Sequence, residues 1–157
     1  MSTNNPIPRD TPPLPQTRTQ ALSRALADYF GSDARRIRHA KRTLEHAQQL
    51  LAATPGADPE VVIAAALLHD IGIKNAEATY GSAEARYQEV EGPPVAREIL
   101  EKLAYPEPMI REVCDIIGHH HHPRAVETAN FQVLYAADQL VNAEEDAARA
   151  IAKGSVQ

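Results

Sequence analysis

A histidine and an aspartate, His69 and Asp70, directly follow one of the most apolar runs of the chain, in the stretch ALLHDIGIK (66–74). The run before them, PEVVIAAALL, is apolar on all sides and predicts a central, buried helix. An aspartate in the last turn of such a helix meets the partial negative charge of the helix terminus, and burying its carboxylate without a partner costs several kcal/mol. A divalent cation bound by the imidazole and the carboxylate would remove both costs. The alternative is a capping histidine beside a solvent-facing aspartate, and this pair alone leaves both interpretations open.

A further carboxylate, Asp138, falls on the apolar face of the last predicted helix. At about 100° per residue it lies in the middle of that face, where an aspartate is rarely left without a partner. The partner is either a metal ion shared with His69 and Asp70 or one of the sixteen lysines and arginines, and the His-Asp pair favours the metal. The apolar residues that define the face recur at helical spacing: Phe131, Leu134, Tyr135 and Val141.

Two more histidines, His39 and His46, lie beside one apolar stripe of the helix predicted over 33–53. They are two turns apart, about 10.5 Å along the helix axis, so one ion cannot take both. Either could instead be a half-buried histidine with an ordinary hydrogen bond. The stripe is formed by Ile37, Ala40, Leu44, Ala47 and Leu51.

The order of these groups along the chain resembles the HD superfamily of metal-dependent phosphohydrolases. The resemblance is carried by His39, by the adjacent pair within HDIG, and by Asp138 on a late helix. It spans about residues 20–145, almost everything outside the N-terminal segment. It implies an all-α fold in which His39, His69, Asp70 and Asp138 bind the first metal ion.

The surroundings of the first histidine match the superfamily as well. Its members usually have a β-branched residue four positions after this histidine and a small residue eight positions after it. Thr43 and Ala47 stand at these positions after His39. The match therefore selects His39 over His46.

Many members of the superfamily carry a second metal ion, held by a histidine before a Gly-x-x-x-Ala-x-x-Ile-Leu helix and by another at the end of the next helix. No histidine precedes that helix here: either Glu89 or Glu91 takes its place, which would favour harder ions, or the second site is weak. In CDIIGHHHHPR (114–124) the helical period continues the apolar face to His120. We therefore expect His120 as the inward ligand and His119 as the neighbour nearest the substrate or the second ion. The helix pattern itself is carried by Gly92, Ala96, Ile99 and Leu100.

The resemblance implies metal-assisted hydrolysis of a small phosphate ester, a nucleotide or a related phosphomonoester. One or two divalent cations (Mn, Fe, Mg, Ni, Co or Zn) would lower the pKa of a bound water and polarise the phosphoryl oxygen. Asp70 would orient the nucleophile and accept its proton. The superfamily often has a lysine three residues after this aspartate; Lys74, one position later, either reaches toward the phosphate or is an exposed surface lysine. Two alternatives remain: a di-iron oxygenase with the same ligand pattern, and a non-catalytic binding module in which the metal is structural.

The elements that must position these residues are predicted to be helices throughout. They form an all-α fold, a single compact bundle of five to seven helices over residues 18–157, in the manner of an HD domain. The proline-rich residues 1–17 are expected to be a disordered tail. The helices are predicted over about 19–30, 33–53 and 58–72, then a short one from Ser82, one from Pro93 or Pro94, one from Pro108, and a long one from about Thr128.

Length and charge restrict the function further. A chain of 157 residues with a net charge of −5 and a pI of about 5.8 is most simply one domain that binds neither a nucleic-acid polymer nor an anionic membrane. We expect a bound cation, not a basic protein surface, to meet the phosphate charge. Because Cys114 stands alone and no stretch approaches the ~20 apolar residues of a membrane span, we expect a cytoplasmic protein. The sequence leaves a homo-oligomer open.

Overall fold

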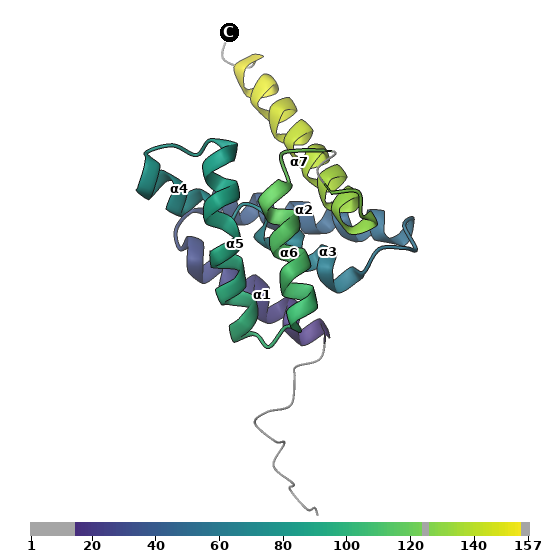
Figure 1. Cartoon of the computed structure of the whole chain (residues 1–157). Coiled ribbons are helices and arrows are strands. Elements are labelled where there is room, and N and C mark those ends of the chain that lie inside the picture. The colour runs from purple at the N-terminus through teal and green to yellow at the C-terminus, as the bar shows by residue number, and fades with distance from the viewer. Residues whose placement is uncertain (1–14, 124–125, 155–157) are drawn as a thin grey trace, which may run out of the picture.

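The computed structural model of the chain describes residues 15–123 and 126–154. Within these residues the chain forms seven helices and no strand (Figure 1). This confirms the predicted all-α bundle of five to seven helices. Residues 1–14 of the proline-rich segment lie outside the described residues, whereas residues 15–17, which were predicted to belong to the disordered tail, begin the first helix. The helices are α1 (Pro15–Phe30), α2 (Ala34–Ala52), α3 (Pro59–Leu68), α4 (Ile73–Tyr80), α5 (Ala85–Lys102), α6 (Glu107–His119) and α7 (Ala129–Gly154).

Aspartate caps fix the starts of the two helices that lead to the site. The carboxylate of Asp33 accepts a hydrogen bond from the backbone N–H of Arg36 at 3.3 Å and begins α2. Asp58 accepts from the N–H of Glu60 at 3.0 Å and begins α3, with Pro59 at the first helical position. Both starts agree with the helices predicted from about residues 33 and 58, and each side-chain acceptor satisfies a free N–H of the first turn.

The helix α3 ends earlier than expected. It stops at Leu68, and residues 69–72 form turns that lead into α4, whereas the sequence predicted a helix to about Gly72. The reason is a close approach between two backbones. A Cβ added at Gly72 would lie 2.5 Å from the carbonyl oxygen of Gln88 and 2.5 Å from the nitrogen of Gly92. Only a glycine lets the chain turn this tightly against α5.

The segment between α3 and α6 also differs from the prediction. The helix α4 was not expected, and the short helix from Ser82 and the helix from Pro93 or Pro94 are one continuous element, α5. Proline is common at a helix start, which led to the wrong prediction. Inside α5 the prolines remove two helical hydrogen bonds, and this part of α5 packs closely against α6. The thiol of Cys114 on α6 donates to the carbonyl oxygen of Pro93 at 3.5 Å, and buried Gly92 contacts Ile117.

The core surrounds α3, which packs against α1, α2, α6 and α7. Its residues 61–62 and 64–68 are all buried, so the predicted central position is confirmed. On the other helices a single face is buried, as amphipathic helices require. The buried part of α7 ends at Val141, and the rest of this helix extends beyond the body of the bundle (Figure 1). No helix of the described part is long and apolar enough to cross a membrane.

Candidate metal centre

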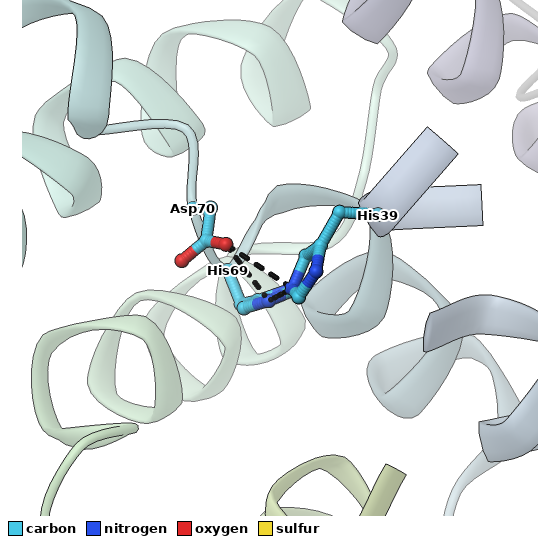
Figure 2. Close-up of side chains that lie close together, drawn as sticks. All are labelled: His39, His69 and Asp70. Carbon is cyan, nitrogen blue, oxygen red and sulfur yellow. Dashed lines mark hydrogen bonds and ion pairs between the residues drawn. The ribbon is translucent and has the colours of Figure 1, made fainter. Parts of the chain in front are cut away.

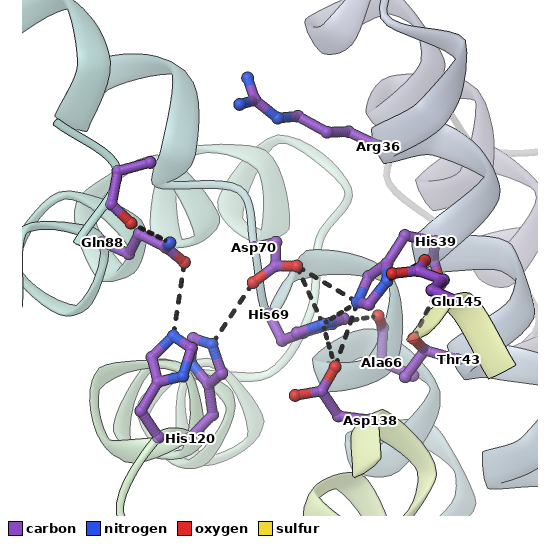
Figure 3. Close-up of polar contacts among 12 residues, drawn as sticks. Arg36, His39, Thr43, Ala66, His69, Asp70, Gln88, His120, Asp138 and Glu145 are labelled. Carbon is purple, nitrogen blue, oxygen red and sulfur yellow. Dashed lines mark hydrogen bonds and ion pairs between the residues drawn. The ribbon is translucent and has the colours of Figure 1, made fainter. Parts of the chain in front are cut away.

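Four side chains from three parts of the fold converge on one point. His39 lies on α2, His69 and Asp70 directly follow α3, and Asp138 lies on α7 (Figure 2; Figure 3). The Nε2 atom of His39 is 3.1 Å from Nε2 of His69 and 3.1 Å from Oδ1 of Asp138. The Nε2 atom of His69 is 3.2 Å from the same oxygen of Asp138. Oδ2 of Asp70 is 3.3 Å from both imidazole nitrogens.

These separations match the edges of a metal coordination shell. Nitrogen and oxygen ligands about 2.0–2.1 Å from a tetrahedrally coordinated ion lie about 3.3 Å from one another. Two Nε2 atoms at 3.1 Å also need a proton or a cation between them, because two imidazole lone pairs repel. The group His39, His69 and Asp70 offers one donor atom each, all within 4.8 Å of one another. The residues present therefore fit a divalent cation.

Hydrogen bonds on the far side of each imidazole orient its Nε2 atom toward the cluster. Nδ1 of His69 donates to the carbonyl oxygen of Ala66 at 2.8 Å, and Nδ1 of His39 donates to Oε1 of Glu145 at 2.8 Å. With the proton held at Nδ1, the lone pair of Nε2 faces inward, which is the tautomer that a metal ligand needs. The hydroxyl of Thr43 donates to the backbone carbonyl of His39 at 2.8 Å, one turn back along α2.

The charges of the cluster balance one another in the absence of an ion. Burial disfavours the imidazolium of His69, which is 1% exposed, but the carboxylates of Asp70 and Asp138 outweigh it and raise the pKa of His69 well above its usual value. Desolvation likewise opposes the ionised form of Asp138, yet His69 and His39 hold the pKa of Asp138 well below its usual range. In the metal-free cluster these contacts favour protons held between the imidazoles and the carboxylates, and a cation can bind by displacing them.

The second oxygen of Asp70 faces a different histidine. Oδ1 of Asp70 is 3.4 Å from Nε2 of His120, whose side chain is buried and whose Nδ1 donates to the carbonyl oxygen of Ile117 at 2.7 Å. At this distance the buried Nε2 atom makes an ion-pair contact with Asp70 but no well-formed hydrogen bond to any described residue. Asp70, His120 and His121 form a further group whose donor atoms lie within 4.8 Å of one another. If two ions were bound, Asp70 could thus contribute one oxygen to each of them.

Within the histidine tract, the structure brings His121 to Asp70 and His120. It does not bring His119 there, because His119 is exposed and its Nδ1 donates to the carbonyl oxygen of Asp115 at 2.8 Å. The sequence placed His120 inward, as the structure does, but assigned the neighbouring position to His119. Desolvation and the adjacent His120 lower the pKa of His121, which favours the neutral imidazole that binds metals.

Three other residues expected at the site have contacts elsewhere. Oε2 of Glu89 is 3.1 Å from Nε2 of His122, and its other oxygen is buried without a partner among the described residues. Lys74 donates from Nζ to the carbonyl oxygen of Tyr29 at 3.0 Å and lies over the ring of Tyr29. The carboxylate of Glu91 lies near Tyr29, because burial and then the charge of Glu91 raise the pKa of Tyr29. No contact within the described part joins Lys74 or Glu91 to the cluster, so their roles stay predictions.

A cavity of about 220 Å³ opens over the cluster and contains residues that the sequence reasoning missed. Arg36 lies on α2 on the same side of the cluster as Asp70 (Figure 3), and the charge of Asp70 contributes to its raised pKa after the larger effect of a hydrogen bond to Glu77. The helical period could have indicated Glu145, seven residues after Asp138 on the same face of α7. The cavity is lined by Arg35, Arg36, His39, Asp70, Ile73, Asn142 and Glu145.

Comparisons with known proteins agree with this geometry. The sequence model of the HD domain family matches residues 36–143, a range that contains every residue of the cluster. The chain is also similar to Ribonuclease Y of Thermus thermophilus, with 38% identity over 104 residues, which are 66% of this chain. The match spans only 16% of that relative's length. No solved structure matches the chain significantly. On the extent of the family match, the chain belongs to the HD domain family.

Proposed function

We propose that the protein is a metal-dependent phosphohydrolase that acts on a small phosphate ester. The observation that carries this proposal is the convergence of two Nε2 atoms and two carboxylates from α2, the end of α3, and α7 at separations of 3.1–3.3 Å. Membership of the HD domain family supports the same chemistry. The name of the relative Ribonuclease Y is consistent with a phosphate ester as the substrate.

The residues of the site have distinct tasks in this proposal. His39, His69 and Asp138 hold the ion, and Asp70 contributes one oxygen to it. A bound divalent cation supplies Lewis acidity and lowers the pKa of a coordinated water. In a site with one ion, Asp70 then orients the attacking water and accepts its proton at Oδ1, which lies outside the first cluster and faces His120. Arg35 and Arg36, which line the cavity over Asp70, meet the oxygens of the phosphate.

We infer that Arg36 contacts the phosphate, the role that the sequence also predicted for Lys74. The cavity that contains Asp70 is lined by Arg36 and does not include Lys74. The guanidinium of Arg36 is held by Glu77, with NH1 3.2 Å from Oε2 of Glu77. A guanidinium fixed in this way can present its remaining N–H groups to phosphate oxygens, which suits its planar geometry.

Metal content is the first test. Untagged protein is compared with His69→Ala and Asp138→Ala by elemental analysis, and His119→Ala serves as the matched control because that histidine is exposed and faces Asp115. We expect one or two equivalents of metal in the wild type and in the control, and a loss of metal in the two cluster variants. Metal that survives both cluster substitutions but is lost with His119 would contradict the proposed centre.

Activity is the second test. The metal-loaded protein is assayed with p-nitrophenyl phosphate and bis(p-nitrophenyl) phosphate, and we expect hydrolysis that His69→Ala abolishes. Iron as the bound metal, combined with oxygen consumption and no hydrolysis, would instead favour the di-iron oxygenase. Metal whose removal unfolds the protein, with neither activity present, would favour the binding module.

A further inference from the structure

The outer face of α2 carries a row of cations next to the metal cluster. Residues 35–42 hold five of the sixteen lysines and arginines of a chain whose net charge is −5. Arg35, Arg38 and Arg42 are three and seven residues apart and so form one stripe, with Lys41 at its edge. All four side chains are exposed. The positive charge of an acidic protein is thus concentrated beside His39.

This row forms one wall of a groove between α2 and α7. The groove has a volume of about 690 Å³ and shares Arg35, His39 and Glu145 with the smaller cavity over Asp70. The opposite wall is the part of α7 that lies beyond its last buried residue, Val141. A ligand with one end at the metal cluster can therefore extend along α2 without leaving the protein surface.

The carboxylates of the groove are already engaged. Oε1 and Oε2 of Glu144 accept from the guanidinium of Arg42 at 2.9 Å each, and Glu145 accepts from His39. Glu45 also pairs with Arg42.

By contrast, Arg35, Arg38 and Lys41 have no ion pair with any residue that the structure describes. The groove consequently offers unpaired positive charge, which the overall charge of the protein does not indicate.

We propose that this groove binds a second phosphate group of the substrate, one nucleoside away from the phosphate at the metal cluster. The proposal rests on the proposed function and names its substrate class: a dinucleotide or the end of a short single strand, and not a simple phosphomonoester. The stripe from Arg35 to Arg42 rises by about 10.5 Å, about three times the rise of about 3.4 Å per nucleotide along the axis of duplex DNA. Arginine and lysine side chains along a groove bind such a backbone through its phosphates.

The test measures binding to the full-length, metal-free protein, so that the ligand stays intact. The probes are AMP, the dinucleotide pApA and a short oligoadenylate, each in equilibrium dialysis over a range of salt concentrations. We expect the wild type to bind pApA about tenfold more tightly than AMP, the scale of a charge-assisted contact. Its affinity for pApA should also fall more steeply as salt increases. One further phosphate contact makes the slope of log affinity against log salt more negative by about 0.7.

Two double variants that remove the same charge distinguish binding in the groove from a general effect of the protein's charge. The double variant Arg38→Gln/Lys41→Gln removes two cations of the groove, whereas Arg24→Gln/Arg111→Gln removes two exposed cations of α1 and α6. We expect the first variant to bring the pApA-to-AMP affinity ratio close to one and the second to leave it unchanged. Equal binding of AMP and pApA by the wild type, or an equal loss in both double variants, would overturn the proposal.

The length series distinguishes the two sources of the second phosphate. An affinity that stops rising at pApA indicates a dinucleotide-sized ligand, and one that rises further with oligoadenylate indicates a nucleic-acid strand. The proposed phosphate-binding groove and the proposed hydrolase activity can be disproved independently of each other. Hydrolysis of p-nitrophenyl phosphate without any preference for pApA would reject the groove and keep the proposed function. A preference for pApA that depends on Arg38 and Lys41, without hydrolysis in the presence of any metal, would reject the proposed function and keep the groove.

Discussion

The Nδ1 atom of His39 lies 2.8 Å from Oε1 of Glu145, so the helix that provides the candidate ligand Asp138 also orients a ligand on α2. Glu145 is two turns after Asp138 on α7 and therefore projects from the same face. A carboxylate that accepts from the far nitrogen of a ligating histidine fixes the tautomer and raises the basicity of the nitrogen that faces the metal. The contact thus couples the packing of α2 and α7 to the metal affinity.

Substituting Glu145 should weaken metal binding without removing a ligand. We expect Glu145→Ala to lower the affinity about 10- to 100-fold, the usual effect of losing such a partner. Glu145→Gln should lower it less, because its amide oxygen can still accept from Nδ1 of His39. The matched control is Glu144→Gln, since Glu144 contacts Arg42 and His46 and not the cluster. A competition titration with a chromogenic chelator measures all three, and equal affinities for Glu145→Ala and the control would contradict the role.

Metal binding should release protons and strengthen as the pH rises. Burial lowers the pKa of His39, but its hydrogen bond to Asp138 and the nearby Asp70 outweigh burial, and the pKa is raised; that of His69 is raised further by Asp70 and Asp138. A raised pKa in the folded state means that these protons stabilise the metal-free protein below the unfolded pKa of about 6.5. This stabilisation is lost as the pH rises through the folded values.

The proton release can be measured by calorimetry. Titrating the metal in two buffers of different protonation enthalpy gives the number of protons released, which should be greatest below the raised pKa values and fall above them. His119→Ala should release the same number, because this residue does not contact the cluster. A metal affinity that is independent of pH between 6 and 8 would show that the imidazoles of the cluster are neutral before the metal binds.

The glycine of HDIG should be essential for stability because of its neighbour and not because of its own conformation. A Cβ at Gly72 would lie 2.5 Å from two backbone atoms of α5, which cannot move aside as a side-chain tip can. We expect Gly72→Ala to lower the free energy of unfolding by about 1–3 kcal/mol, as for overpacked cores. Gly56→Ala is the control, since nothing lies within 4 Å of a Cβ there. Urea unfolding measures both, and equal stabilities would refute the close approach.

The local sequence was sufficient to predict much of this fold. The capped start Asp58-Pro59 and the apolar run after it predicted α3 and its central position, because both signals lie within one helix. Periodicity placed Asp138 on the core face of α7. By contrast, the start of α5 depends on how Gly92 packs against Ile117 and on the contact of Gly72 with α5. Long-range contacts of this kind outweigh the local preference of proline for a helix start.

The sequence also predicted part of the candidate metal site. Residues inside regular helices, such as His39 and Asp138, were placed correctly on their faces because the helical period is constant. The histidine tract lies at the end of α6, where the last helical residue is His119 and the chain turns at His120. A period extended past a helix end cannot predict which of the following side chains turns inward. Arg36 and Glu145 were missed because each acts on a partner from another helix.

The position of His121 leads to a prediction about the number of metal ions. Asp70 directs Oδ2 to the first cluster and Oδ1 to His120, and the buried Nε2 of His120 lacks a hydrogen-bond partner within the described residues. The separation of 3.4 Å between this Nε2 atom and Oδ1 of Asp70 is longer than a well-formed hydrogen bond, and a second ion shared by Asp70, His120 and His121 would bind both atoms. The wild type should therefore bind a second, weaker equivalent of metal when the ion is in excess.

Three single substitutions test this second ion. His120→Ala and His121→Ala should each lose the weaker equivalent while retaining the first, because neither residue belongs to the group around His39. His119→Ala should retain both, since its imidazole faces Asp115. Isothermal titration with Mn²⁺ or Zn²⁺ gives both stoichiometries directly. Loss of the second equivalent in His119→Ala but not in His121→Ala would restore the assignment made from the sequence, and a single equivalent in the wild type would show that Asp70 does not bridge two ions.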